Sequence, residues 1–285
     1  MAKSKMMFPV LETQKQGKGK GSDRINSVFL SLCGKYGLSD PDRWSLRSES
    51  SSGLNGPVSL IWNHSKKEEI IPLFPWRQER RFQELARLVE SKTVEDVVLC
   101  RFSCFTGDRN GSLESLLYRE FDLAEWLNGS AIISLYGTRG GTQFMNLLLH
   151  LANGAICSLE AGTMMPDKFS QRAMDRHELI GRRGVASDRV VDTQIPQESI
   201  YLYTPKGEKR FTDTDSELFG LEDSLVYSIR DAFSFVRQYG SGSNKDLVQA
   251  IRNRRRDHDR LTGLIDLAVK SADLEKPFKV KGAKK

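Results

Sequence analysis

The chain has 285 residues, of which 39% are hydrophobic, enough for one large domain or two modest ones. No stretch approaches the ~18 apolar residues that cross a membrane. The N-terminal sequence MAKSKMMFPVLETQ lacks the apolar centre of a signal peptide. We therefore expect a cytoplasmic protein.

The net charge of +6 is carried by the two ends of the chain. Residues 1–22 hold a net +4 and residues 276–285 a net +5, so the residues between them total −3. A nucleic-acid-binding protein usually carries its basic patch on the folded body. We therefore interpret both ends as disordered basic tails and disfavour nucleic acid as a partner.

The cysteines and histidines match no metal-binding or redox motif. The cysteines are Cys33, Cys100, Cys104 and Cys157, and the histidines are His64, His150, His177 and His258. We expect free, buried thiols, as is usual in a reducing compartment, and no metal site.

The first elements are short. Residues 23–37 have the spacing of a helix, residues 38–57 are rich in turn residues, and residues 58–64 (VSLIWNH) are typical of a strand. The segment 23–72 therefore offers one helix and one strand.

Longer elements follow. Residues 76–92 and 112–129 have apolar side chains at helical spacing, and a glycine, Gly129, closes the second helix. Residues 94–107 and 131–141 have the period of strands.

Three hairpins and two helices complete the chain. The hairpins are expected to turn at Asn153-Gly154, at residues 181–184 and at residues 205–208, and the helices to span residues 223–240 and 244–272. This order predicts an α+β fold, with a large, mostly antiparallel sheet and helices on one face.

Several glycine-rich or basic stretches invite a functional interpretation. Residues 17–22 and 240–245 lack the preceding strand that a phosphate-binding loop requires. The arginine-rich segment 252–260 contains two aspartates and fits the exposed face of an amphipathic helix.

From residue 73 onward, the order of motifs resembles the C-terminal domain of the Gfo/Idh/MocA family. Residues 116–129 (LLYREFDLAEWLNG) resemble that family's H-x-x-D-x-x-x-W-L-x-G helix, and Arg77 falls where its arginine sits, although Glu95 replaces a glycine. The family's N-G hairpin, l-x-G-x-x-G strand and closing helix are matched by residues 147–162, 177–186 and 260–272.

This resemblance implies a C-terminal-like domain over residues 73–275 and a relative of NAD(P)-dependent oxidoreductases of sugars and polyols. Arg119, however, occupies the position of the family's acid/base histidine, and Ser115 that of a carboxylate. Arginine cannot accept a proton near neutral pH. Glu120 is the nearest replacement, but adjacent helical residues point about 100° apart.

The family's cofactor domain has no counterpart in the residues before 73, which show no Gly-rich strand–helix turn. The family's catalytic lysine lies in a Glu-Lys-Pro segment of that domain. Here Glu275-Lys276-Pro277 follows the last helix, and we interpret that match as coincidence.

We therefore expect a non-catalytic, oligomerising relative without a bound cofactor. Arg77, Ser115 and Arg119 are the expected substrate-binding residues, and Arg119 could grip a carboxylate or phosphate. No catalytic residue is expected; the only candidates are Arg119, Glu120 and Asp122.

The expected partner is a second copy, or a full-length relative, on the open sheet face around Phe144, Leu148 and Ile156. Two alternatives stay open. One is an NAD- or NADP-dependent oxidoreductase whose cofactor site is reduced or supplied by another chain. The other is binding of nucleic acid or an acidic partner by the tails.

Overall fold

A computed structural model describes residues 21–38, 43–48, 58–64, 67–107, 112–165, 173–188, 199–204, 207–212, 221 and 223–280. The expected N-terminal tail, apart from residues 21 and 22, and the last five residues lie outside this description. No helix in the described part is long and apolar enough to cross a membrane.

The helices are α1 (Gly21–Lys35), the 3-10 helix η2 (Pro75–Gln78), α2 (Arg80–Glu90), α3 (Leu113–Asn128), α5 (Asp223–Tyr239) and α6 (Asn244–Leu274). The strands are β1 (Trp44–Ser48), β2 (Val58–His64), β3 (Lys67–Pro72), β4 (Val97–Thr106), β5 (Ile132–Arg139), β6 (Phe144–Leu151), β7 (Ile156–Gly162), β8 (Ala173–Gly181), β9 (Gly184–Ser187), β10 (Ser199–Thr204), β11 (Gly207–Thr212) and β12 (Phe278–Lys279).

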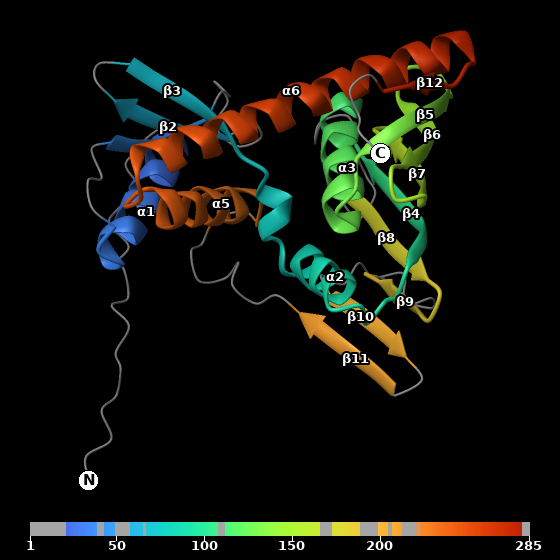
Figure 1. The fold of residues 1–285 in the computed structure, drawn as a ribbon. Coiled ribbons are helices and arrows are strands. Elements are labelled where there is room, and N and C mark those ends of the chain that lie inside the picture. Colours follow the sequence, from blue (N-terminus) through green and yellow to red (C-terminus); the bar gives the residue numbers. More distant parts are fainter. Residues whose placement is uncertain are drawn as a thin grey trace.

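A nine-stranded sheet forms the larger half of the fold, in the order β11-β10-β9-β8-β4-β7-β6-β5-β12 (Figure 1). Its strands pair antiparallel except for β4 and β7, which run parallel. The chain leaves β4 through α3 before it returns, as a parallel pair requires. The α+β fold with a mostly antiparallel sheet is confirmed.

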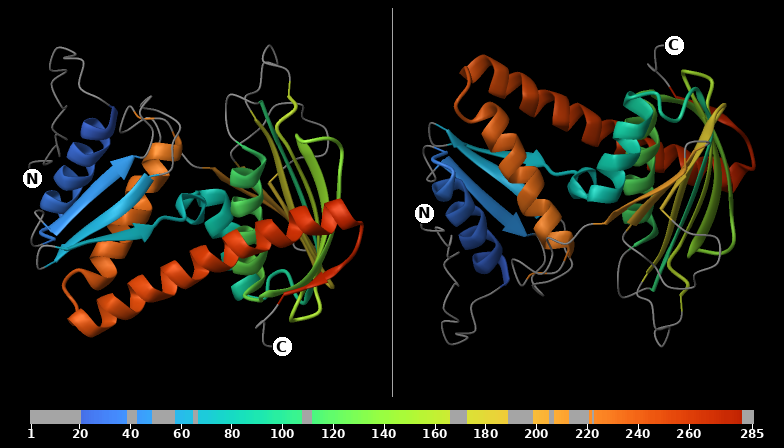
Figure 2. Two further views of the ribbon diagram at one scale, coloured as in Figure 1. Left: turned by 90° about the horizontal axis from the view of Figure 1, so that it is seen from above. Right: turned by 90° about the horizontal axis from the view of Figure 1, so that it is seen from below.

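The helices α2, α3 and the C-terminal part of α6 lie on the same face of this sheet (Figure 2). Inward-facing residues of the strands and apolar residues of the helices form one core there, which includes Phe82, Phe102, Phe121, Leu147 and Leu264. Strand β6 shows the alternation clearly, since Met145, Leu147, Leu149 and Leu151 are buried whereas Leu148 is 40% exposed.

A second core lies under the three-stranded sheet β1-β2-β3, whose strands all pair antiparallel. Trp44 and Trp62 stack there, with 6.2 Å between their ring centroids. Phe29 of α1, Phe235 of α5 and Ile251 of α6 pack into the same core. Residues 225–251, which the sequence motifs grouped with the larger domain, thus pack against the N-terminal segment.

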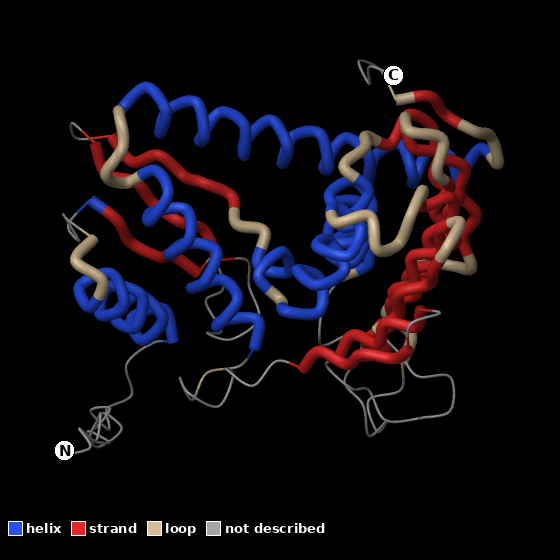
Figure 3. Tube along the Cα trace, turned by 60° about the horizontal axis from the view of Figure 1, so that its bottom comes forward, coloured by secondary structure: helices blue, strands red, loops and turns tan. Residues whose placement is uncertain are grey.

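The long helix α6 connects the two cores, running from the small sheet to the large one (Figure 3). On α6, Arg254 donates to both oxygens of Asp231 on α5, at 2.6 and 2.8 Å, and to the carbonyl of Pro72 at 3.1 Å. Asp231 is 1% exposed and also accepts from the backbone N–H of Phe74. This buried ion pair ties α5, α6 and the end of β3 together.

The structure corrects three expectations about local structure. The helix expected over residues 76–92 is interrupted, because Glu79 is extended (ψ 127°) between η2 and α2. Strands β1 and β3 lie in segments where no strand was expected.

The C-terminal segment is not wholly a tail. Phe278 pairs with Leu135 of β5, and the N–H of Val280 donates to the carbonyl of Ile133. Lys276, in the Glu-Lys-Pro match, accepts at its carbonyl from the Ser271 hydroxyl at 2.6 Å. Lys276 therefore helps to terminate α6.

Candidate functional site

The residues singled out from the sequence lie mainly on α3, so the ends of this helix fix their positions. At its N-terminus the side chains of Ser112 and Ser115 each accept a hydrogen bond from the other's backbone N–H, at 3.1 and 3.2 Å. At its C-terminus Gly129 adopts a left-handed conformation (φ 56°), which glycine does at little cost. Ser115, expected to bind substrate, therefore caps the helix.

Asp122 faces η2, where two side chains bind it. Its carboxylate is 3% exposed and forms an ion pair with Arg77. The indole N–H of Trp76 and the Nε of Arg77 both donate to Oδ2, at 2.6 and 2.8 Å. Burial opposes the charge on Arg77, but the hydrogen bond and charge of Asp122 outweigh it and raise the pKa of Arg77. Arg77 thus anchors η2 to α3.

Arg119 occupies a different environment on the same helix. Its guanidinium donates to both oxygens of Asp175 on β8 at 3.0 and 2.9 Å, and its Nη2 lies 2.8 Å from the sulfur of Cys104. Its Nε donates to Glu120 at 2.8 Å. Burial disfavours the cation, yet the carboxylate of Asp175 holds the pKa of Arg119 well above its usual value.

Glu120 meets Arg119 although adjacent helical residues point in different directions. Glu120 is fully buried, and the long arginine side chain folds back to reach it. The two side chains therefore meet although their Cβ directions differ, because the arginine side chain is long enough to span the angle between them. Burial alone would raise the pKa of Glu120, but Arg119 and His177 lower it.

His177 completes this cluster, although nothing in its local sequence singles it out as functional. Its Nδ1 lies 2.8 Å from Asp188 and its Nε2 lies 3.0 Å from Glu120, and the side chain is fully buried. The rings of Phe82 and Phe102 meet it edge-on. Burial disfavours the imidazolium, but the charges of Glu120 and Asp188 raise the pKa of His177 to about 9.

Arg81 on α2 closes the cluster on its outer side. It donates to Glu79, Asp175 and Asp188 at 2.8, 3.0 and 3.3 Å. We call this set the α3 charge network; it consists of Glu79, Arg81, Arg119, Glu120, Asp175, His177 and Asp188. Every cation in it has a carboxylate partner, so the network is suited to hold the helices on the sheet.

The ionisable side chains of the α3 charge network are paired with one another. Arg119 cannot release its proton at physiological pH. Both ring nitrogens of His177 are engaged by carboxylates, and a protonated imidazole has no lone pair to accept a further proton. The structure places Arg119 and Glu120 together. Ser115 and Asp122 lie elsewhere on α3, and Arg77 lies on η2, where it pairs with Asp122.

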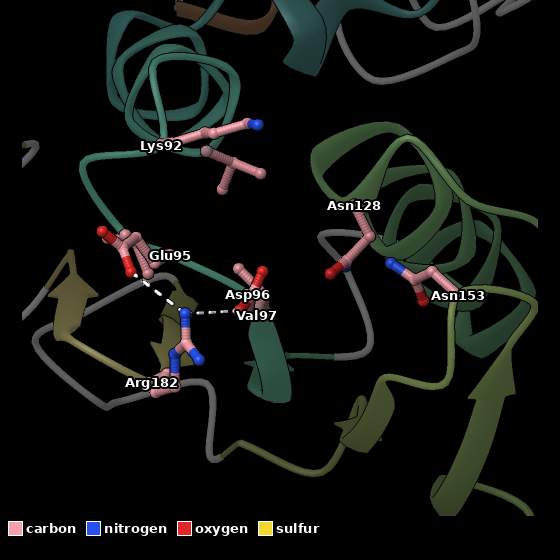
Figure 4. Close-up of a pocket in the computed structure, with 9 residues that line it drawn as sticks. Lys92, Glu95, Asp96, Val97, Asn128, Asn153 and Arg182 are labelled. Carbon is pink, nitrogen blue, oxygen red and sulfur yellow. Dashed lines mark hydrogen bonds and ion pairs between the residues drawn. The ribbon is translucent and has the colours of Figure 1, made fainter.

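A cavity of about 390 Å³ lies at the other end of α3, near the starts of β4 and β7. Figure 4 shows Asn128 and Asn153 on one side of it and Glu95, Asp96 and Arg182 on the other. Arg182 pairs with both acids there, at 3.4 and 3.1 Å. None of the site residues expected from the sequence lines this cavity.

Two features of the described residues bear on metal and dinucleotide binding. Within them, no group of three or more His, Cys, Asp or Glu side chains could hold a metal ion. The described residues of segment 21–72 form one helix and three antiparallel strands, whereas dinucleotide-binding folds use parallel βαβ units.

No protein-family model and no curated protein matches the chain. Among solved structures, it is similar to the transcriptional regulator Gal80p from Kluyveromyces lactis, with 13% identity and a TM-score of 0.56, over 75% of this chain and 61% of that one. It is also similar to an oxidoreductase from Agrobacterium radiobacter in complex with NAD⁺, L-tartaric acid and magnesium, with 14% identity and a TM-score of 0.52, over 73% and 64% of the two chains.

A third similar structure is myo-inositol 2-dehydrogenase from Lactobacillus plantarum, with 13% identity and a TM-score of 0.50, over 73% and 64% of the two chains. The chain thus spans less than two thirds of the length of these proteins. Its neighbours are Gfo/Idh/MocA-type proteins, so the resemblance expected from the motifs is confirmed for the fold.

Proposed function

We propose that this chain is a non-catalytic relative of the Gfo/Idh/MocA oxidoreductases, which associates with a second copy of itself through the open face of the nine-stranded sheet. The observation that carries the proposal is the set of contacts made by the Arg119 guanidinium. The guanidinium is bound to Asp175, Glu120 and Cys104 at the helix position where the resemblance implies an acid/base histidine.

Two further observations support the non-catalytic role. Segment 21–72 adopts an antiparallel arrangement in its described residues, which differs from a dinucleotide-binding fold. One of the structural neighbours, Gal80p, is described as a transcriptional regulator and not as an oxidoreductase. The shared fold therefore also occurs in a protein named for a regulatory role.

Exposed apolar side chains on the open face of the sheet support the proposed association. Tyr136 on β5 is paired with Leu148 on β6, and these side chains are 37% and 40% exposed. In the same cross-strand row, Leu148 is followed by Ser158 on β7 and then by the charged Arg101 on β4. The apolar side chains of this row lie over β5 and β6, so we place the apolar centre of the proposed interface there.

Light scattering coupled to gel filtration tests the association. We expect a dimer, and we expect Leu148→Glu to convert it to a monomer because a carboxylate would be buried in the interface. Ile70→Glu is the matched control, because Ile70 is 48% exposed on β3 of the small sheet, and it should leave the dimer intact. A monomeric wild-type chain, or a dimer insensitive to Leu148→Glu, would refute association through this face.

A further inference from the structure

Two cysteines lie side by side inside the large sheet. Cys100 on β4 and Cys157 on β7 are direct partners in the parallel register, and both are fully buried. Directly opposed residues on neighbouring strands point to the same face of a sheet. The strand spacing of about 4.8 Å falls within the Cα separation that disulfides span, about 4.4–6.8 Å. The backbone therefore places the two thiols within bridging distance.

The two thiols are not equivalent. Hydrogen bonding to Cys157 lowers the pKa of Cys100 against the opposing effect of burial, and Asn128 lowers it further, with its Nδ2 3.2 Å from the Cys100 sulfur. Burial raises the pKa of Cys157 well above its usual value. Cys100 is thus suited to act as the thiolate and Cys157 as the thiol that resolves the oxidised sulfur.

Asn128 lies between this pair and a cavity. This residue both contacts the sulfur of Cys100 and lines the cavity at the C-terminal end of α3 (Figure 4). A small solute in the cavity is therefore one side chain away from Cys100. The other two cysteines differ, since Cys104 lies against Arg119 and Cys33 belongs to the second core.

We propose that Cys100 and Cys157 form a dithiol site that hydroperoxides convert to a disulfide between β4 and β7. In the first step the Cys100 thiolate attacks one peroxide oxygen, the O–O bond breaks, and hydroxide leaves when hydrogen peroxide is the oxidant. The product is a sulfenic acid on Cys100. In the second step the Cys157 sulfur attacks Cys100, its proton passes to the departing hydroxyl, and water leaves as the S–S bond forms.

The test is peptide mapping of the folded, full-length chain after treatment with hydrogen peroxide. Trypsin separates the cysteines, because Cys100 lies in peptide 93–101, Cys104 in peptide 102–109 and Cys157 in peptide 140–168. We expect the intact chain to lose two hydrogen atoms and peptides 93–101 and 140–168 to become linked. Dithiothreitol should separate them again.

Variants distinguish this site from non-specific oxidation. Cys100→Ser should abolish the linked peptides, whereas Cys104→Ser, on the same strand, and Cys33→Ser should retain them. Because the main readout uses the wild-type chain, a variant that fails to fold does not decide the result. The proposal is overturned if peroxide leaves both thiols free in the wild-type chain, links Cys100 to another cysteine, or links the pair only after the chain is unfolded in urea.

Discussion

Arg119 on α3 and Asp175 on β8 form a two-point ion pair, in which Nη1 and Nη2 of the guanidinium each contact one carboxylate oxygen, at 3.0 and 2.9 Å. The side chains of Arg119 and Asp175 are only 17% and 14% exposed. Arg119 also forms an ion pair with Glu120, whose side chain is fully buried. The pair therefore fixes α3 to the sheet at the position where the family resemblance implies proton transfer.

Replacing Arg119 tests its structural role. Arg119→Met should lower the free energy of unfolding by about 3–5 kcal/mol, because it leaves the buried carboxylates of Glu120 and Asp175 without their shared cation. Urea denaturation measures this loss. Arg256→Met is the matched control, since the Arg256 side chain is 74% exposed, and a change within about 0.5 kcal/mol is expected there. Equal effects of the two changes would contradict the structural role.

His177 makes stability depend on pH in the alkaline direction. Its pKa is raised from 6.5 to about 9 in the folded chain, so its contribution is fully present below about pH 6.5 and is lost as the pH rises through 9. The shift corresponds to about 3 kcal/mol. Urea denaturation between pH 6 and pH 9.5 should therefore show falling stability.

The matched variant for this prediction is His177→Gln, which cannot titrate. Its stability should be lower at pH 6, and it should vary less across the same range because the proton-linked contribution is gone. A wild-type chain whose stability rises or stays level from pH 6.5 to 9 would show that His177 is not held as an imidazolium.

Two glycines with different surroundings flank the turn between β8 and β9, Gly181 at the end of β8 and Gly184 at the start of β9. A Cβ on Gly181 would lie 2.3 Å from the carbonyl oxygen of Glu95 and 2.8 Å from Cγ1 of Val94, whereas on Gly184 the nearest atom would be 3.6 Å away. Gly181→Ala should therefore destabilise the chain by about 1–3 kcal/mol. Gly184→Ala should change stability by no more than about 0.5 kcal/mol. Thermal unfolding of the two variants measures the difference. Equal losses of stability in both variants would contradict the close approach at Gly181.

Elements with a strong local pattern could be predicted from the sequence. The helix expected over residues 112–129 is α3, with Gly129 at its end, and the hairpin at Asn153-Gly154 is β6–β7. Strand β3 could not be predicted, because its sequence KEEIIP carries charges where apolar alternation would be needed. Antiparallel pairing with β2 holds this segment as a strand although its own sequence does not alternate.

The α3 charge network depends on contacts distant in sequence, and this explains why it was only partly predicted. Arg119 and Glu120 were singled out from their helix, but His177 meets Glu120 across 57 residues and Asp188 across 11. An alternating strand pattern can indicate that His177 faces inward, since Leu179 on the same strand is buried. It cannot indicate which carboxylates will be opposite.

Calorimetric titration of the full-length chain with NADH and with NADPH tests the central claim most directly, because a nicotinamide-dependent oxidoreductase must bind one of these nucleotides to transfer a hydride. The proposed non-catalytic role predicts no heat of binding for either nucleotide at concentrations that saturate a nicotinamide-dependent oxidoreductase. Saturable binding of one nucleotide per chain would contradict it and would favour an oxidoreductase with a reduced cofactor site.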